Sequence, residues 1–229
     1  MNIIEKMMAT NLVGLDLGSD SIKFVQLKST SKGYQLVKGG VFEMSSEAMG
    51  EEVEQELKEA LLVETIKKIF KENKINSRNV VTTVSGESVI VRHVKLPAMS
   101  EEELKGVIQY EAEQYIPNVE QFALDFKIIG ETTDDNQKKI EVLLVGAKHE
   151  LLEKHLKLLD DAGLRSIIID VDSLALSNAY EVNYANEAEE GVVLLNIGSK
   201  LSTISIMDGL NLKNTRDIFI GGGNFTRDI

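Results

Sequence analysis

Cysteine is absent from the 229-residue sequence. Without thiols the chain can form neither a disulfide nor a zinc–thiolate site, which excludes the small disulfide-stapled folds and the thiolate zinc modules. The composition is compatible with a reducing compartment. Hydrophobic residues make up 43% and charged residues 27% of the chain, so enough apolar side chains remain for one large domain or two modest ones.

Long apolar runs and an excess of positive charge are also absent. No run approaches the roughly 18 residues of a membrane-spanning helix, so we expect no transmembrane segment. Lysine and arginine together number 25 against 37 aspartate and glutamate residues, a net charge of -12. That balance argues against non-specific nucleic-acid binding and against a basic membrane-surface patch. Aromatic residues are sparse at 5% and are not interleaved with basic ones, so nucleic acid is not an expected partner.

The N-terminal segment does not have the features of a secretory signal. Met1–Thr10 lacks both a long apolar core and a small-residue cleavage site. Two interpretations remain for this segment, a short amphipathic helix or a frayed terminus, and we favour the frayed terminus.

Residues 14–23 contain the most informative stretch, GLDLGSDSIK. Apolar runs at 12–17 and 22–27 flank a turn of glycine, serine and aspartate, which predicts a β-hairpin. Such a turn can aim several backbone N–H groups and two hydroxyls at one point, which suits a phosphate. Asp16, at the end of the first strand, could hold a metal ion directly or through water. The alternative is a tight hairpin in which serine and aspartate only form the turn.

Strand and helix patterns alternate along the rest of the chain. We expect strands at 34–44, 79–84, 88–96, 122–129, 139–146 and 164–171, helices at 45–73, 100–116, 148–162 and 172–184, and an acidic loop at 186–190. Ser100 and Glu103 form a capping box that opens one of these helices, and Pro117 closes it. No histidine shares a ligand spacing with carboxylates, so we predict surface or packing roles for His93, His149 and His155.

A second hairpin pattern near the end of the chain repeats the first at a constant offset along the sequence. The matched positions are Asp16 with Asn196, Leu17 with Ile197, Gly18 with Gly198, Ser19 with Ser199, and Lys23 with Thr203. A repeated strand–turn–strand unit predicts two related subdomains that face each other, with a phosphate chain between the turns. The alternative is that two strands end in Gly-Ser by chance.

The ordered set of motifs resembles the actin-like ATPase superfamily and, within it, the PilM family of type IV pilus assembly proteins, which is related to the cell-division protein FtsA. Five segments carry the resemblance: the two hairpins at 14–23 and 195–203, DVDSLALSNA at 170–179 as the interdomain helix, GGGNFT at 221–226 as the start of a later helix, and residues 91–117 as the small subdomain typical of PilM and FtsA.

The resemblance implies an α/β, actin-like (ribonuclease H-like) fold with a mixed sheet, helices and a small inserted β-α-β-β subdomain. The implied first subdomain comprises residues 1–87 and 148–184, and the insertion comprises 88–147. Residues 185–229 would begin a second actin-like domain.

The resemblance also implies that ATP and Mg²⁺ bind between the two domains. Asp16 and Asn196 would hold Mg²⁺ through water, and Lys23 would supply a point charge to the phosphates. The implied nucleotide-binding residues are Gly18, Ser19, Asp20, Ser21, Lys23, Gly198, Ser199, Thr203, Gly221 and Gly222. Asp172 corresponds to the group that positions the attacking water in relatives, and a plain helix N-cap explains Asp172 equally well.

One departure from the family pattern bears on catalysis. The second phosphate motif usually begins with Asp, and Asn196 removes that negative charge. Nucleotide binding can survive this change better than hydrolysis can, so we predict a nucleotide-binding adaptor first and a weak ATPase second. The alternatives are a small-molecule kinase or phosphatase of the same superfamily, or a filament-forming cytoskeletal protein. A kinase would carry an Asp base and a sugar-binding loop, and we find neither.

The implied partner is the N-terminal cytoplasmic peptide of an inner-membrane pilus assembly protein, PilN in the family, bound in a groove beside the small subdomain. The implied location is the cytoplasm, at the inner membrane through that partner, and a homo-oligomer is a further alternative. The stretch from Gly191 to Ile229 is too short for a second subdomain comparable to the first. We therefore expect a fragment that binds ATP weakly or not at all by itself, with terminal strands that can pair with another chain.

Overall fold

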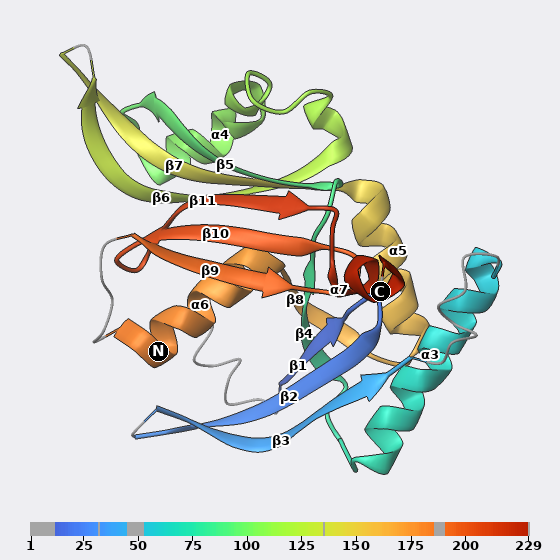
Figure 1. Ribbon diagram of the computed structural model, residues 1–229. Helices are drawn as coiled ribbons and strands as arrows, with labels where there is room; N and C mark the ends of the chain where they lie inside the picture. The colour runs from blue at the N-terminus through green and yellow to red at the C-terminus, as the bar shows by residue number, and fades with distance from the viewer. Residues whose placement is uncertain (1–11, 32, 45–52, 135, 186–190, 229) are drawn as a thin grey trace.

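Three β-sheets and the helices between them make up the structure, a computed structural model that describes residues 12–31, 33–44, 53–134, 136–185 and 191–228 (Figure 1). A five-stranded sheet has the order β3-β2-β1-β4-β8, and two three-stranded sheets have the orders β5-β7-β6 and β11-β10-β9. The expectations for residues 1–10, 45–52 and 186–190 lie outside the described residues.

The five-stranded sheet is mixed, as predicted. Its strands are β1 (Val13–Leu17), β2 (Ser21–Thr30), β3 (Gly33–Glu43), β4 (Asn79–Val84) and β8 (Arg165–Val171). The first three strands form an antiparallel meander, whereas β1, β4 and β8 run parallel to one another. The parallel strands therefore end at the same edge of the sheet, and this edge receives the turn between β1 and β2.

Two helices, α3 (Gln55–Glu72) and α5 (His149–Asp161), pack on the five-stranded sheet. Apolar side chains recur at helical spacing on α3, and Ile66 and Ile69 of that face are almost completely buried. They share one core with Val13, Ile22 and other side chains of the sheet. The charged residues of α3 lie on the opposite, solvated face.

A second core lies in the sheet of β5 (Val89–Pro97), β6 (Phe122–Asp134) and β7 (Gln137–Lys148). Helix α4 (Glu101–Ala112) and the 3-10 turn η1 (Val119–Gln121) cover it. The predicted capping box is confirmed, since Ser100 Oγ accepts from the Glu103 N–H and the Glu103 carboxylate accepts from the Ser100 N–H. The assignment of residues 88–147 as an inserted domain stays a prediction.

The third sheet consists of β9 (Val192–Ile197), β10 (Ser202–Asp208) and β11 (Asn211–Ile218), followed by the short helix α7 (Gly222–Asp228). Helix α6 (Asp172–Tyr184) contacts β10 and β11 of this sheet as well as β4 and β8 of the five-stranded sheet. It therefore joins the two sheets, as its position directly after β8 requires. Within the described ranges, no helix combines the length and the apolar character that crossing a membrane requires.

Two predicted boundaries were wrong. Helix α4 ends at Ala112, and a turn follows before Pro117, in which the Ile116 N–H donates to the carbonyl of Ala112 and the Ile116 side chain joins the second core. The strands expected at 122–129 and 139–146 extend into the residues between them, since β6 and β7 stay paired as far as Asp134 and Gln137. The sequence did not predict this extension, because strands in a hairpin that projects into solvent are polar on both faces and lack the apolar alternation by which a strand is recognised.

Leu104 tests the second core. It is fully buried on α4, whereas Val107 on the same helix is 39% exposed. We expect Leu104→Ala to lower the free energy of unfolding by about 2–5 kcal/mol, because the truncation leaves a cavity. Val107→Ala is the matched control and should cost much less. Urea denaturation followed by circular dichroism measures both, and equal losses would contradict the assignment of the core.

Candidate functional site

The shared edge at which β1, β4 and β8 end collects polar residues from three distant parts of the chain. Asp16 and Gly18 come from the end of β1, Ser85 follows β4, and Asp172 follows β8. The ends of parallel strands are the usual position for ligands in α/β sheets, because the connections there leave backbone and polar groups facing outward. This edge is therefore the first candidate for a site.

The first hairpin turn is as tight as its sequence predicts. The Gly18 N–H donates to the carbonyl of Ser21 at 3.1 Å, and a Cβ atom on Gly18 would lie 2.8 Å from the same oxygen. Asp16 and Lys23 are directly opposed in the ladder. The Lys23 Nζ donates to Asp16 Oδ2 at 2.8 Å, and both side chains remain about half exposed. The turn thus places one positive and one negative group beside its backbone.

The second hairpin repeats this geometry at the positions that the sequence repeat predicts. The Gly198 N–H donates to the carbonyl of Leu201 at 2.9 Å, and a Cβ atom on Gly198 would lie 2.7 Å from that oxygen. Asn196 and Thr203 oppose each other, as Asp16 and Lys23 do. The repeat in the sequence is therefore a repeat in strand register and turn hydrogen bonding as well.

Both turns face one cavity of about 590 Å³, which we call the hairpin cavity. Predicted site residues that line it are Asp16, Gly18, Ser19, Asp20, Ser21, Lys23, Asp172, Asn196, Gly198, Ser199 and Thr203. The structure thus brings together residues from both hairpins and from the start of α6. Side chains at Gly18 or Gly198 would collide with the turn itself, so only glycine keeps these two walls in place.

The remaining predicted residues, Gly221 and Gly222, do not line the hairpin cavity. They pack behind the second turn, where the Gly222 N–H donates to the carbonyl of Gly198 at 2.8 Å. A Cβ atom on Gly221 would clash with the carbonyl oxygen of Ser199. This close approach of two backbones explains the glycine at 221 without any ligand.

Asp172 begins helix α6, and the structure does not support its alternative role as the N-cap. The capping position is Val171, and no side chain makes a capping hydrogen bond there. The side chain of Asp172 instead lines the hairpin cavity together with Ser85. Asp172 therefore adds a carboxylate to the lining of this cavity.

Thr203 is buried, with 3% of its surface exposed. Its hydroxyl donates to Asp217 Oδ1 at 2.8 Å, and the Gly86 N–H donates to Asp217 Oδ2 at 2.9 Å. Asp217 was not predicted as a site residue, because no local sequence pattern indicates that β11 approaches the turn between β4 and β5.

The polar residues of the hairpin cavity that were not predicted as site residues are Thr83, Ser85, His155 and Lys200. Thr83 lies near the end of β4, and Ser85 directly follows that strand. These polar residues at a strand end could have indicated that β4 also contributes to the site. His155 Nε2 lies 3.2 Å from the hydroxyl of Thr82. Burial lowers the pKa of His155, so its neutral form is favoured at pH 7. Its predicted packing role holds in part, since it also forms a wall of the cavity.

No group of three or more histidine, aspartate or glutamate side chains gathers as a metal site in the part of the chain that the structure describes. Asp16 and Asp20 are the carboxylates that the first hairpin adds to the cavity, and the counterpart of Asp16 in the second hairpin is the neutral Asn196. Mg²⁺ is often held in proteins by one or two carboxylates together with ligand phosphates and water. The donor set of the cavity fits that mode of binding and not an all-protein cage.

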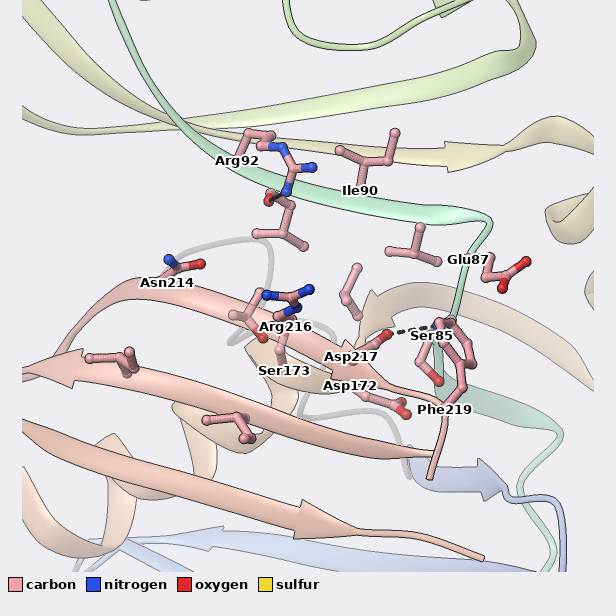
Figure 2. A pocket seen from close by; sticks show the side chains of 17 residues that line it. Ser85, Glu87, Ile90, Arg92, Asp172, Ser173, Asn214, Arg216, Asp217 and Phe219 are labelled. Carbon is pink, nitrogen blue, oxygen red and sulfur yellow. Dashed lines mark hydrogen bonds between the residues drawn. The ribbon is translucent and has the colours of Figure 1, made fainter. Parts of the chain in front are cut away.

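A second cavity, of about 630 Å³, lies between β5, the sheet of β10 and β11, and the start of α6 (Figure 2). We call it the small-sheet cavity. Its walls are apolar at Ile90, Ile204 and Ile206, and Arg92 and Arg216 extend into it. Both β5 and β11 are edge strands of their sheets. Ser85 and Asp172 line this cavity and the hairpin cavity alike, so the two share a wall.

The arrangement of a mixed sheet, a joining helix and two facing hairpins is that of the actin-like ATPases, and the chain has this mixed α/β fold. The family model described as "Type IV pilus assembly protein PilM" matches residues 14–229, and the chain belongs to that family. The predicted superfamily and family are both confirmed.

Two solved structures illustrate the similarity. A chain of a "PilM-PilN type IV pilus biogenesis complex" is 26% identical with a TM-score of 0.80 over 96% of this chain. The match covers 65% of that chain, so the present sequence spans less than two thirds of its length. The cytoplasmic domain of EpsL, an inner membrane component of the type II secretion system of Vibrio cholerae, is 14% identical. Its TM-score is 0.55 over 92% of this chain and 71% of that one, which shows a shared fold.

Gly18→Ala tests the first turn. We expect this variant to open the turn, because a Cβ atom would lie 2.8 Å from the carbonyl oxygen of Ser21. Gly106→Ala is the matched control, since its Cβ would enter open space on α4 and should stabilise the helix by about 0.5–1 kcal/mol. Amide chemical shifts of residues 16–23 measure the turn. Unchanged shifts in Gly18→Ala would show that the turn does not need glycine.

Proposed function

We propose that the chain is a nucleotide-binding adaptor of type IV pilus assembly. It binds Mg²⁺ and ATP in the hairpin cavity and the cytoplasmic tail of an inner-membrane partner in the small-sheet cavity. The observation that carries the nucleotide half is the pair of hairpins, which share register and turn hydrogen bond and face one cavity. Membership of the PilM family supports the adaptor half.

The phosphates lie between the two turns in this proposal. The Gly18 and Gly198 positions lack side chains, so a phosphate can approach the backbone on both sides. Ser19, Ser21 and Ser199 add hydroxyl groups along the walls. Phosphate binding in such turns relies on backbone N–H groups, which compensate locally for a chain with a net charge of -12.

Lys23 supplies the positive charge, and Asp16 positions it. The 2.8 Å ion pair holds the lysine at the wall of the cavity, while its half-exposed side chain remains accessible to a ligand. Lysine acts as a compact point charge and does not require a fixed planar geometry. Asp16, with Asn196 opposite, is also the proposed water-mediated ligand of Mg²⁺, an ion that screens the phosphate charges when bound.

The second hairpin favours binding over hydrolysis. Asn196 can accept a hydrogen bond from a metal-bound water, but it contributes no negative charge. Asp172 lines the cavity from the start of α6, apart from Asp16 and Asp20 of the first hairpin, and is the carboxylate that we assign to orienting water near the phosphates. We therefore assign Asp172 the catalytic role in any slow ATP hydrolysis. Nucleotide then acts chiefly as a ligand that favours one arrangement of the two hairpins over another.

The partner tail docks in the small-sheet cavity, which lies beside the three-stranded sheet of β5, β6 and β7. An extended peptide can pair with the edge strand β5 or β11 and place apolar side chains against Ile90, Ile204 and Ile206. The similar solved chain is described as a PilM–PilN complex, which supports a PilN-like partner for this chain. Through that partner the adaptor would work in the cytoplasm at the inner membrane.

Lys23→Ala tests the nucleotide half. We expect the affinity for Mg-ATP to fall about 10- to 100-fold, because a hydrogen bond to a charged group contributes about 1.5–3 kcal/mol. Lys28→Ala is the matched control, since Lys28 lies on the same strand, is exposed and does not line the cavity. Calorimetric titration of the longest product of the gene measures both. Wild-type affinity in Lys23→Ala, or no Mg-ATP binding in the wild type, would refute the site.

Ile206→Asp tests the partner half. A carboxylate in the apolar wall should reduce the affinity for the N-terminal cytoplasmic peptide of a PilN-like protein about tenfold or more, since about 1.4 kcal/mol corresponds to a factor of ten. Val193→Asp is the control, because Val193 opposes Ile206 on β9 and lies outside the cavity. Peptide titration by fluorescence anisotropy gives both constants. Equal losses in the two variants would place the peptide elsewhere.

A further inference from the structure

The carboxylate of Asp217 on β11 joins two segments of the chain. One is the start of β10, at Thr203, and the other is the turn between β4 and β5, at Gly86, which lies 131 positions before Asp217 in the sequence. Its Oδ1 accepts the Thr203 hydroxyl at 2.8 Å, and its Oδ2 accepts the Gly86 N–H at 2.9 Å. Figure 2 shows Asp217 directed toward the turn after β4. Each carboxylate oxygen is therefore engaged by a different part of the structure.

These two donors belong to different cavities. Thr203 lines the hairpin cavity, whereas Gly86 and Asp217 line the small-sheet cavity. The hydrogen bonds thus cross the wall that Ser85 and Asp172 share between the cavities. A displacement of Asp217 on one side of this wall changes the surface on the other side.

The segment that Asp217 holds can respond to such a displacement. Gly86 has a φ of 91°, a conformation that L side chains rarely adopt, and it sits at the turn between β4 and β5. Strand β4 belongs to the five-stranded sheet and β5 to the three-stranded sheet of β5, β6 and β7. Hydrogen bonds to an ionised acceptor are stronger than neutral ones, so Asp217 is well suited to fix the direction of this turn.

Thr203 makes the link responsive to a ligand, because its hydroxyl has a single proton. In the structure that proton is donated to Asp217. A phosphate oxygen that accepts the same proton would compete directly with the carboxylate. The carboxylate of Asp217 would then keep the Gly86 N–H and could move with that turn, while its backbone stays paired with Thr203 between β10 and β11.

We propose that Asp217 is a positioning residue that couples the two cavities, so that phosphate in the hairpin cavity alters the small-sheet cavity. The inference rests on the proposed function, because it needs a phosphate ligand in the hairpin cavity. Coupling of this kind is reciprocal. If nucleotide changes the affinity for an occupant of the small-sheet cavity by some factor, that occupant changes the affinity for nucleotide by the same factor.

The absence of cysteine from these 229 residues makes a direct test available in the longest product of the gene, with any cysteine outside them replaced by serine. Asn214→Cys introduces the sole thiol on the wall of the small-sheet cavity and accepts an environment-sensitive fluorophore. The same label at Glu131→Cys, on the exposed hairpin of β6 and β7, serves as the control. Saturating Mg-ATP should shift the emission of the label at 214 and leave the label at 131 unchanged.

The same emission shift is then measured in two variants of Asp217. Asp217→Ala removes the carboxylate, and Asp217→Asn removes its charge but preserves the shape of the side chain. Recording at saturation keeps altered nucleotide affinity out of the comparison. We expect the shift at position 214 to be lost in Asp217→Ala and reduced at least twofold in Asp217→Asn. A full wild-type shift in both variants, or a shift at both label positions in the wild type, overturns the coupling.

Hydrogen exchange at the Gly86 amide separates this inference from the proposed function, since it needs no nucleotide. We expect exchange at least tenfold faster in Asp217→Ala and intermediate in Asp217→Asn. Equal exchange in all three proteins overturns the positioning role, whatever the nucleotide result. Faster exchange in a protein that fails to bind Mg-ATP supports the positioning role of Asp217 and refutes the nucleotide site alone.

Discussion

Two backbone hydrogen bonds determine much of the functional edge of this protein. In each hairpin the N–H of a glycine, Gly18 or Gly198, donates to the carbonyl three residues later and leaves no room for a Cβ atom. That constraint brings the strands into register, and the register in turn places Asp16 against Lys23 and Asn196 against Thr203. The chemistry of the cavity walls is therefore a consequence of how tightly the backbone turns.

The joining helix α6 depends on the same edge. It begins at Asp172, directly where β8 ends beside β4, and contacts both the five-stranded sheet and the sheet of β9, β10 and β11. Its first turn consequently lies in the wall that the hairpin cavity and the small-sheet cavity have in common. The five-stranded sheet, helix α6 and both cavities thus meet at Ser85 and Asp172, so a change at either residue affects both cavities.

Sequence patterns predicted the elements of this edge well, because each depends on local information. The alternation of apolar residues in 12–17 and 22–27, followed by the same pattern near the end of the chain, was sufficient for both hairpins. Most of the candidate residues meet at one cavity. The prediction failed for α4 beyond Ala112 and for the hairpin of β6 and β7, where tertiary packing and solvent exposure decide the ends. Local patterns did not identify Asp217 or the residues that line the small-sheet cavity, since these come together through contacts between segments that are far apart in the sequence.

The repeated hairpins are alike in backbone and unlike in charge. The first has an acid and a base at its paired positions, Asp16 and Lys23, whereas the second has the neutral pair Asn196 and Thr203. In the turns themselves the charges are opposite, since the first turn carries Asp20 and the second carries Lys200. The pseudo-symmetric cradle therefore has a direction, and a linear polyanion placed in it would encounter two chemically different ends.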